Sequence, residues 1–225
     1  MLKFRLFSAG LLLLLLSSCT QNQAPMFTPP EGKVKLINLD PGHFHAALVQ
    51  KSMYETVDRN VYVYAPDGPE VKSYLKRISD YNSREADPTA WEEQVYTGAD
   101  FLEKMLSERR GNVMVVSGNN SKKTEYILRS IQAGIHVLAD KPMVISPEEF
   151  PMLEEAFATA REKGVLLYDI MTERHEITTL LQKELSQLPD VFGELQKGSP
   201  DNPAITKESV HHFSKIVSGI PLKRP

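Results

Sequence analysis

The sequence predicts an α/β protein built on a doubly wound, Rossmann-like parallel sheet. Short apolar runs alternate with helical segments along most of the chain, which is the pattern of successive βαβ units. One of these runs, Ile135–Ala139, stops abruptly at an acid, a lysine and a proline. The first run is followed by a turn around Gly42, at the place where such sheets bind their ligands.

Each expected element has a local reason. The strands are short runs of apolar or β-branched residues. Gly134 and Gly164 are placed to end helices, and Pro147 suits a first helical turn. The expected strands are Val34–Leu39, Asn60–Tyr64, Asn112–Ser117, Ile135–Ala139 and Val165–Asp169. The expected helices are Phe44–Met53, Pro69–Ile78, Ala99–Glu108, Ser121–Ala133 and Pro147–Lys163.

Residues 1–18 are predicted to be a lipoprotein signal peptide. Positive charge at Lys3 and Arg5 precedes the leucine run Leu11–Leu16, which is too short to span a bilayer as a stable helix. The following Leu-Ser-Ser-Cys resembles a bacterial lipobox, which would make Cys19 the lipidated first residue of the mature chain. We therefore expect a lipid-anchored protein of the bacterial cell envelope, periplasmic or on the outer membrane. The alternative is an ordinary signal peptide with an incidental cysteine.

The rest of the composition narrows the class of protein. Residues 19–33 are rich in Gln, Pro and Thr and are expected to form a flexible tether. Cys19 is the single cysteine, so no intramolecular disulfide can form. The net charge of −3, without a basic patch, gives no reason to expect nucleic-acid binding.

The segment from Gly134 to Pro142 carries the strongest functional signal. Asp140 and Lys141 follow a buried strand at its carboxyl end, where open α/β sheets place their ligands. Pro142 fixes its own φ and moves Lys141 away from helical geometry, so the lysine projects from an ordered turn. The alternative interpretation is a solvated turn between a strand and a helix.

This segment, with the strand Asn112–Ser117 before it, resembles the glucose–fructose oxidoreductase / inositol dehydrogenase / MocA-like family (Gfo/Idh/MocA) over about residues 34–176. The resemblance implies a Rossmann domain that binds NAD or NADP and transfers hydride to or from a sugar or sugar-like polyol. In that family the strand usually runs into Glu-Lys-Pro. By analogy, Lys141 would contact the reacting hydroxyl, Asp140 would tune that lysine, and Pro142 would lie beside the cofactor.

The phosphate loop departs from the family pattern. Asp40-Pro41-Gly42-His43-Phe44-His45 stands where a Rossmann domain carries Gly-x-Gly-x-x-Gly. Only Gly42 remains, and Asp40 brings a negative charge near the expected phosphate. We expect Gly42, His43 and His45 to contact the cofactor, with the histidines donating to phosphate or substrate. Alternatively, the histidines only shape a tight turn and cap the helix.

Further cofactor contacts are expected at two other strand ends. Asp67 could accept the ribose hydroxyls, although Pro-Asp-Gly is equally typical of a surface turn. Ser117, Asn119 and Asn120 could contact the nicotinamide half of the cofactor. The histidine that relatives often carry on the following helix is missing.

Substrate contacts are expected after the last Rossmann strand. Relatives place an Arg or Asn there in the cleft between domains, which selects Arg174 and His175. His175 and Glu176 could equally cap the next helix. No metal site is expected, because the pair His211-His212 lacks an acidic partner at ligand spacing. A metal hydrolase using His43, His45 and His175 is a remote third possibility.

Residues 177–225 correspond to the start of the C-terminal substrate and dimerisation domain of relatives, an open-sheet α+β unit. Phe192 to Leu195 is expected to be its first strand. The Asp-x-x-x-His acid/base pair of relatives does not occur, and one strand cannot bury its own face, so we expect a truncated piece of a longer protein. A homo-oligomer is expected only if that domain is complete.

Two functions follow from these patterns. The first is an oxidoreductase whose cofactor is tightly bound, because an envelope protein meets little free NAD(H). The second is a non-catalytic, lipid-anchored Rossmann-like binding protein that lost its phosphate loop.

Overall fold

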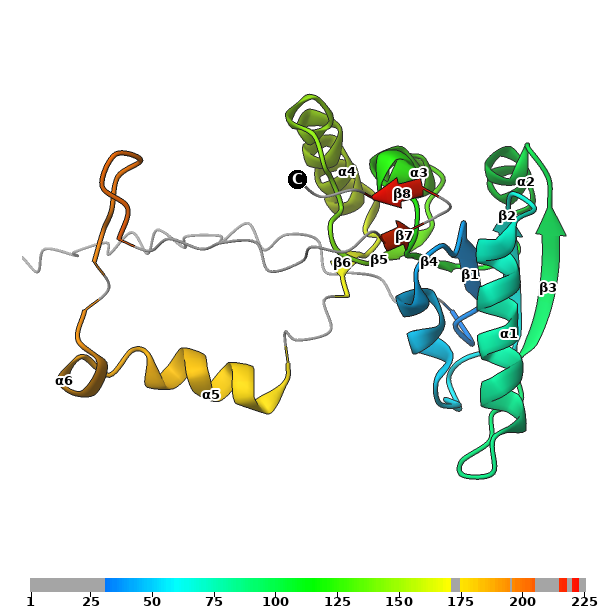
Figure 1. The fold of residues 1–225 in the computed structure, drawn as a ribbon. Coiled ribbons are helices and arrows are strands. Elements are labelled where there is room, and N and C mark those ends of the chain that lie inside the picture. Colours follow the sequence, from blue (N-terminus) through cyan, green and yellow to red (C-terminus); the bar gives the residue numbers. More distant parts are fainter. Residues whose placement is uncertain (1–30, 171–174, 195, 205–214, 218–219, 223–225) are drawn as a thin grey trace, which may run out of the picture.

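The computed structural model describes residues 31–170, 175–194, 196–204, 215–217 and 220–222 (Figure 1). The signal peptide, with Cys19, and most of the tether lie outside the described residues, as does Arg174. The strands of the main sheet are β1 (Leu36–Leu39), β2 (Asn60–Ala65), β3 (Glu92–Thr97), β4 (Val113–Val116), β5 (His136–Ala139) and β6 (Leu167–Asp169). The helices between them are η1 (Phe44–Gln50), α1 (Pro69–Ser83), α2 (Phe101–Glu108), α3 (Asn120–Gln132), η2 (Pro147–Glu149) and α4 (Phe150–Lys163).

The main sheet is parallel throughout and has the strand order β3-β2-β1-β4-β5-β6. The direction of winding therefore reverses between β1 and β4, and this reversal is the switch point at which doubly wound sheets bind ligands. The structure confirms the predicted Rossmann-like fold.

Helices cover both faces of the sheet, and each face has its own core. Alternate residues of β4 point to opposite faces: Met114 and Val116 pack against α2, α3 and α4, whereas Val113 and Val115 pack against η1 and α1. Such a strand must be apolar on both sides. Figure 1 shows α3 and α4 on one side of the sheet.

The expected helix over Phe44–Met53 is instead the shorter 3₁₀ helix η1, which ends at Gln50. The backbone carbonyl of Ala46 accepts a hydrogen bond from the side-chain amide of Asn38 at 3.0 Å. That carbonyl would otherwise serve as the i to i+4 acceptor of an α-helix. The helix is therefore shorter than expected because of a tertiary contact, since Asn38 belongs to strand β1.

Two other elements differ from expectation. The edge strand β3 was not predicted, because Glu92–Thr97 is polar and mostly exposed and shows no apolar run. The expected strand at Phe192 is wrong, since Phe192 ends the short helix α6 (Pro189–Phe192). Leu195 lies outside the described residues.

The described part of the C-terminal segment also contains α5 (Ile177–Leu185) and the antiparallel pair β7 (Lys215–Val217) and β8 (Ile220–Leu222). In Figure 1, α5 and α6 extend away from the main sheet. Among the described residues, none of the helices combines the length and the apolar character needed to cross a bilayer.

A buried polar cluster fixes η1 against α1 and β3. The side-chain oxygen of Gln50 accepts the hydroxyl of Tyr74, and its amide donates to Glu93 at 3.0 Å. The Trp91 indole donates to the Gln50 backbone carbonyl at 2.6 Å. Gln50, Tyr74 and Trp91 are buried, so these bonds give their polar groups partners where water is excluded.

Replacing Tyr74→Phe should lower the free energy of unfolding by about 1–3 kcal/mol, because it leaves the buried Gln50 oxygen without its donor. Urea denaturation followed by circular dichroism measures this change. Tyr54→Phe is the matched control, since Tyr54 is 50% exposed. Equal stability of the two variants would contradict the role of the cluster.

Candidate active site

The site lies where the carboxyl ends of β1, β4 and β5 come together. The register aligns Leu39 with Val116, and Val116 with Ala139, so Asp40, Ser117 and Asp140 leave the sheet side by side. These are three of the residues that the sequence places after buried strands. The sheet itself therefore assembles groups from distant parts of the chain.

The two loops at the switch point are in direct backbone contact. The amides of Gly42 and His43 both donate to the carbonyl of Ser117, at 3.0 and 3.1 Å. A Cβ atom on Gly118 would lie 2.3 Å from the Asp40 carbonyl oxygen and 2.5 Å from the Gly42 nitrogen. Glycine is therefore required at position 118 by the close approach of the loops.

This contact changes the phosphate loop. In a Rossmann domain, backbone amides after the first strand receive the pyrophosphate. Here the amides of Gly42 and His43 are already bonded to Ser117. Gly42 keeps its expected position, but its amide points into the protein rather than to a ligand. A dinucleotide bound here would need other groups for its phosphates.

Asp140 is the centre of a buried hydrogen-bond cluster. Both carboxylate oxygens lie 3.1 Å from Nδ1 of His45, and Oδ2 lies 3.4 Å from Nδ1 of His43. The Ser117 hydroxyl donates to Oδ2 and the Lys141 amide to Oδ1, each at 2.9 Å. Burial alone would raise the pKa of Asp140, but the hydrogen bonds from the histidines and the serine lower it well below its ordinary value.

Both histidines of the loop belong to this cluster. His43 also caps η1, where its Nδ1 accepts the amide of His45 at 3.4 Å. The structure therefore shows the capping role that the sequence left open, and adds a contact with Asp140 that the sequence did not indicate. A role of His43 and His45 as cofactor contacts stays a prediction.

Lys141 leaves this cluster with its side chain in solvent. Its backbone is fixed from both sides, by the bond to Asp140 and by Thr124, whose hydroxyl donates to the carbonyl of Met143 at 2.8 Å. Within the described ranges, Lys141 has no ion-pair partner. The Asp140 carboxylate faces the histidines and Ser117. Pro142 follows through a cis peptide bond and is exposed.

The sequence does not indicate a role for Lys123. Its side chain lies beneath the turn that carries Asp140 and Lys141. Its amine is buried and donates to the backbone carbonyl of Asp140 at 3.0 Å. Burial lowers the pKa of Lys123 to about 8, against the attraction of Asp140. A lysine in the first turn of a helix is usually exposed, so no local pattern marks it. It holds the peptide between Asp140 and Lys141 in place.

Asp40 does not present its charge to the loop as expected. Its backbone has a positive φ of 46°, and its buried carboxylate accepts the hydroxyl of Tyr126 at 3.2 Å. Burial raises the pKa of Asp40, which favours the neutral form relative to an exposed aspartate. The carboxyl group is therefore directed toward α3.

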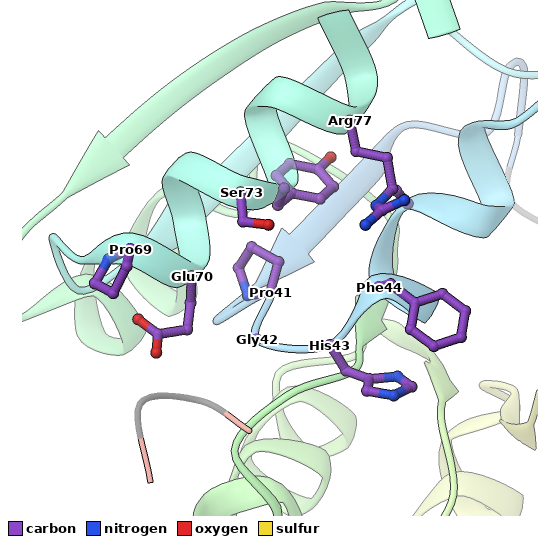
Figure 2. Close-up of a pocket in the computed structure, with 10 residues that line it drawn as sticks. Pro41, Gly42, His43, Phe44, Pro69, Glu70, Ser73 and Arg77 are labelled. Carbon is purple, nitrogen blue, oxygen red and sulfur yellow. The ribbon is translucent and has the colours of Figure 1, made fainter. Parts of the chain in front are cut away.

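A cavity of about 300 Å³ opens beside this loop (Figure 2). Its volume is at the lower end of the range for small-molecule sites. Arg77 and Ser73 of α1 point into it, and the Arg77 guanidinium lies 6.0 Å from the ring centre of Phe44. The wall on the loop side is made of Pro41, Gly42, His43 and Phe44, and the other side of Pro69, Glu70, Ser73, Tyr74 and Arg77.

The other expected cofactor residues, Asp67, Asn119 and Asn120, are not among the residues that line this cavity. Asp67 is exposed and pairs with Lys72 at 3.3 Å in a surface turn, so its ribose contact stays a prediction. Asn119 takes the N-cap position of α3 and accepts the hydroxyl of Ser121 at 2.7 Å, and Asn120 begins the helix. These residues neighbour Ser117 in the chain.

The expected substrate residue His175 is exposed, with its Nε2 3.4 Å from the hydroxyl of Tyr168. Glu176 caps α5 by accepting the amides of Thr178 and Thr179. From the sequence, either His175 or Glu176 could cap this helix, and the structure shows that Glu176 does so. A substrate role of His175 and of Arg174, which lies outside the described residues, stays a prediction.

A parallel sheet with this strand order has the Rossmann-like topology in which dinucleotides bind at the switch point, here between β1 and β4. The family model described as "Oxidoreductase family, NAD-binding Rossmann fold" (Gfo/Idh/MocA) matches residues 42–169. The chain therefore belongs to the Gfo/Idh/MocA oxidoreductase family, and NAD or NADP is its cofactor class. A second model, "Putative oxidoreductase C terminal domain", matches residues 181–225.

Solved structures agree with this assignment. A "putative oxidoreductase from Parabacteroides merdae ATCC 43184" is 62% identical, with a TM-score of 0.76 over 86% of this chain and 44% of that one. GenD2 from gentamicin A biosynthesis, solved with NAD, is 19% identical, with a TM-score of 0.50 over 72% and 43%. Biliverdin reductase from Synechocystis sp. PCC 6803, solved with biliverdin and NADP⁺, is 12% identical, with a TM-score of 0.50 over 68% and 43%.

The last two comparisons show a shared fold alone. The chain spans less than half the length of each of these proteins. None of the curated proteins compared with the chain is significantly similar to it.

The close loop contact predicts a stability effect. Gly118→Ala should lower the free energy of unfolding by about 1–3 kcal/mol, because the new methyl group would meet backbone atoms of Asp40 and Gly42 that cannot rotate away. Urea denaturation measures the change. Lys122→Ala, at an exposed site on α3, is the control, and a Gly118→Ala variant as stable as this control would argue against a tight loop contact.

Proposed function

We propose that the protein is an NAD(P)-dependent oxidoreductase that transfers hydride between a sugar or sugar-like polyol and a tightly held nicotinamide cofactor. The observation that carries the proposal is the position of Lys141. Its side chain leaves the carboxyl end of β5 next to the switch point, on a backbone fixed by Asp140 and Thr124. An exposed amine on so rigid a turn suits contact with a ligand.

Lys141 acts on the reacting hydroxyl of the substrate. Its amine would donate a hydrogen bond to the hydroxyl oxygen and stabilise the negative charge that develops there as the hydroxyl proton passes to solvent water, to which the exposed Lys141 side chain is open. The bound nicotinamide supplies the hydride chemistry. Lys123 and Asp140 act as positioning residues, since both bond to the peptide that carries Lys141.

The cofactor's phosphates are held by side chains of α1 rather than by loop amides. The amides of Gly42 and His43 are bonded to Ser117. Arg77 and Ser73 point into the neighbouring cavity and can supply a cation and a hydroxyl donor (Figure 2). A cationic contact of this kind also suits retention of the cofactor between turnovers.

The proposed location is the bacterial cell envelope, through a lipid on Cys19. The charged start, the leucine run and the Leu-Ser-Ser-Cys string support this location. Free NAD(H) is scarce outside the cytoplasm. A retained cofactor that is oxidised and reduced within one catalytic cycle removes this difficulty.

Lys141→Met should slow the reduction of the bound cofactor by a polyol by about 10²- to 10⁴-fold, the usual contribution of an acid/base group. The amount of bound cofactor should not change. Single-turnover kinetics followed by the absorbance of the reduced nicotinamide measures the rate, and the dinucleotide released on denaturation measures the amount bound. Lys122→Met is the control, because Lys122 is exposed and pairs with Glu125 on the helix surface. Unchanged turnover in Lys141→Met would exclude the catalytic role.

Arg77→Ala should reduce the amount of NAD(P) that copurifies with the protein, because the cavity loses its cation. Denaturing the purified protein and quantifying the released dinucleotide by chromatography measures the occupancy. Lys76→Ala is the matched control, since Lys76 is exposed and pairs with Asp80. Equal occupancy in both variants would remove Arg77 from the cofactor site.

A second candidate function is a non-catalytic, lipid-anchored binding protein. The observation in its favour is that the loop amides which should receive phosphate are used within the protein. Under this alternative, the wild-type protein releases no dinucleotide on denaturation and turns over no polyol. Finding a nicotinamide cofactor in the wild-type protein would argue against it.

A further inference from the structure

We propose that His43, His45 and Asp140 form a binding site for one divalent transition-metal ion of the zinc type. The site is independent of the cofactor proposal, because it rests on the geometry of these side chains alone. It goes against the expectation from sequence, which predicted no metal site. The remote alternative, a metal hydrolase, grouped the loop histidines with His175 rather than with Asp140.

Two of the distances between the side chains match those between the ligands of a bound metal ion. One ligand atom from each residue can be chosen so that all three lie within 4.8 Å of one another. Nδ1 of His45 is 3.1 Å from the carboxylate of Asp140, and Nδ1 of His43 is 3.4 Å from it. Ligands on a tetrahedral zinc ion with bonds of 2.0–2.1 Å lie about 3.3 Å apart.

The chemistry of the three groups fits the same class of ion. Imidazole nitrogen together with carboxylate oxygen binds zinc and its neighbours in the first transition row, and it is a poor set for calcium or magnesium. Three protein ligands leave a further coordination position open, as in catalytic rather than structural zinc sites. His43 also lines the cavity, so a molecule in the cavity would lie beside the ion.

The surroundings hold the ligands in place. Ser117 and the amide of Lys141 each donate to one oxygen of Asp140 at 2.9 Å, as the partners of a metal-bound carboxylate do. The rings of His43 and His45 meet edge to face with centroids 4.3 Å apart, and Phe44 contacts both rings. Side-chain exposure is 14% for His43, 11% for His45 and 3% for Asp140.

The competing description is a cluster joined by hydrogen bonds alone. Asp140 would then accept from His45, from Ser117 and from the Lys141 amide, while Nδ1 of His43 accepts the His45 amide. In that state His45 needs a proton on Nδ1, whereas a metal needs a lone pair on the same atom. The two descriptions therefore differ in what a metal titration shows.

The test uses wild-type protein purified without a histidine tag and treated with EDTA. Titration with Co²⁺ should saturate at one ion per chain and give the intense visible absorption of a low-coordinate cobalt site, and Zn²⁺ should displace the cobalt. Calorimetry with Zn²⁺ gives the affinity. A cobalt spectrum that stays that of the hydrated ion would overturn the proposal, whatever the activity of the protein.

Variants assign the site to its residues. Ser117→Ala should weaken zinc binding by about 10- to 100-fold, because it removes the hydroxyl that donates to a ligand carboxylate. His45→Ala should weaken it by more than about 100-fold, because it removes a ligand itself. His175→Ala should bind as wild type, because His175 lies outside the group. Circular dichroism checks folding, and His43→Asn replaces His45→Ala if that variant does not fold. Wild-type affinity in a folded histidine variant would also overturn the proposal.

Discussion

The hydrogen bonds to the Asp140 carboxylate are the interaction on which the rest of the site depends. They join the loop after β1, through His43 and His45, to Ser117 at the end of β4 and to the turn that carries Lys141. Removing this carboxylate would leave several buried polar groups without a partner. The acid that directly follows strand β5 therefore holds the loops of the switch point together.

This arrangement accounts for the unusual phosphate loop. A glycine-rich loop keeps its amides free for a ligand. In this loop two amides donate to the Ser117 carbonyl, and both imidazoles lie against the Asp140 carboxylate. The polar groups of this loop therefore make contacts within the protein instead of contacts with a ligand. The helix that follows is short because the buried Asn38 side chain bonds to one of its carbonyls. The polar groups left facing the cavity are side chains, Arg77 and Ser73 among them. Recognition of a dinucleotide here must therefore differ from that of a standard Rossmann domain.

Lys123 and Lys141 show how burial separates two residues of the same type. Lys123 lies under the turn, bonded to the Asp140 carbonyl, and burial lowers its pKa to about 8. Lys141 lies on the outer side of the same peptide in solvent. One lysine supports the backbone and the other is presented to a ligand, and only their surroundings in three dimensions distinguish them.

Much of the fold could be predicted from the sequence. Parallel strands buried on both faces need continuous apolar runs, so β1, β4 and β5 are visible locally, and glycines mark helix ends. The Asp140-Lys141-Pro142 string also selected the turn at the switch point. The edge strand β3 was missed because an exposed polar strand has no such pattern.

The assembly of the site was decided by tertiary structure alone. His45 and Asp140 are 95 residues apart in the chain, and nothing local to either indicates that they meet. The burial of Lys123, the inward turn of Asp40 and the use of the Gly42 amide depend likewise on the parallel pairing of strands that are distant in sequence. The sequence by itself determined which elements form and which turn carries the lysine. The tertiary structure decided which residues contact that turn. Hydrogen bonds between residues distant in sequence form only once the strands are in register.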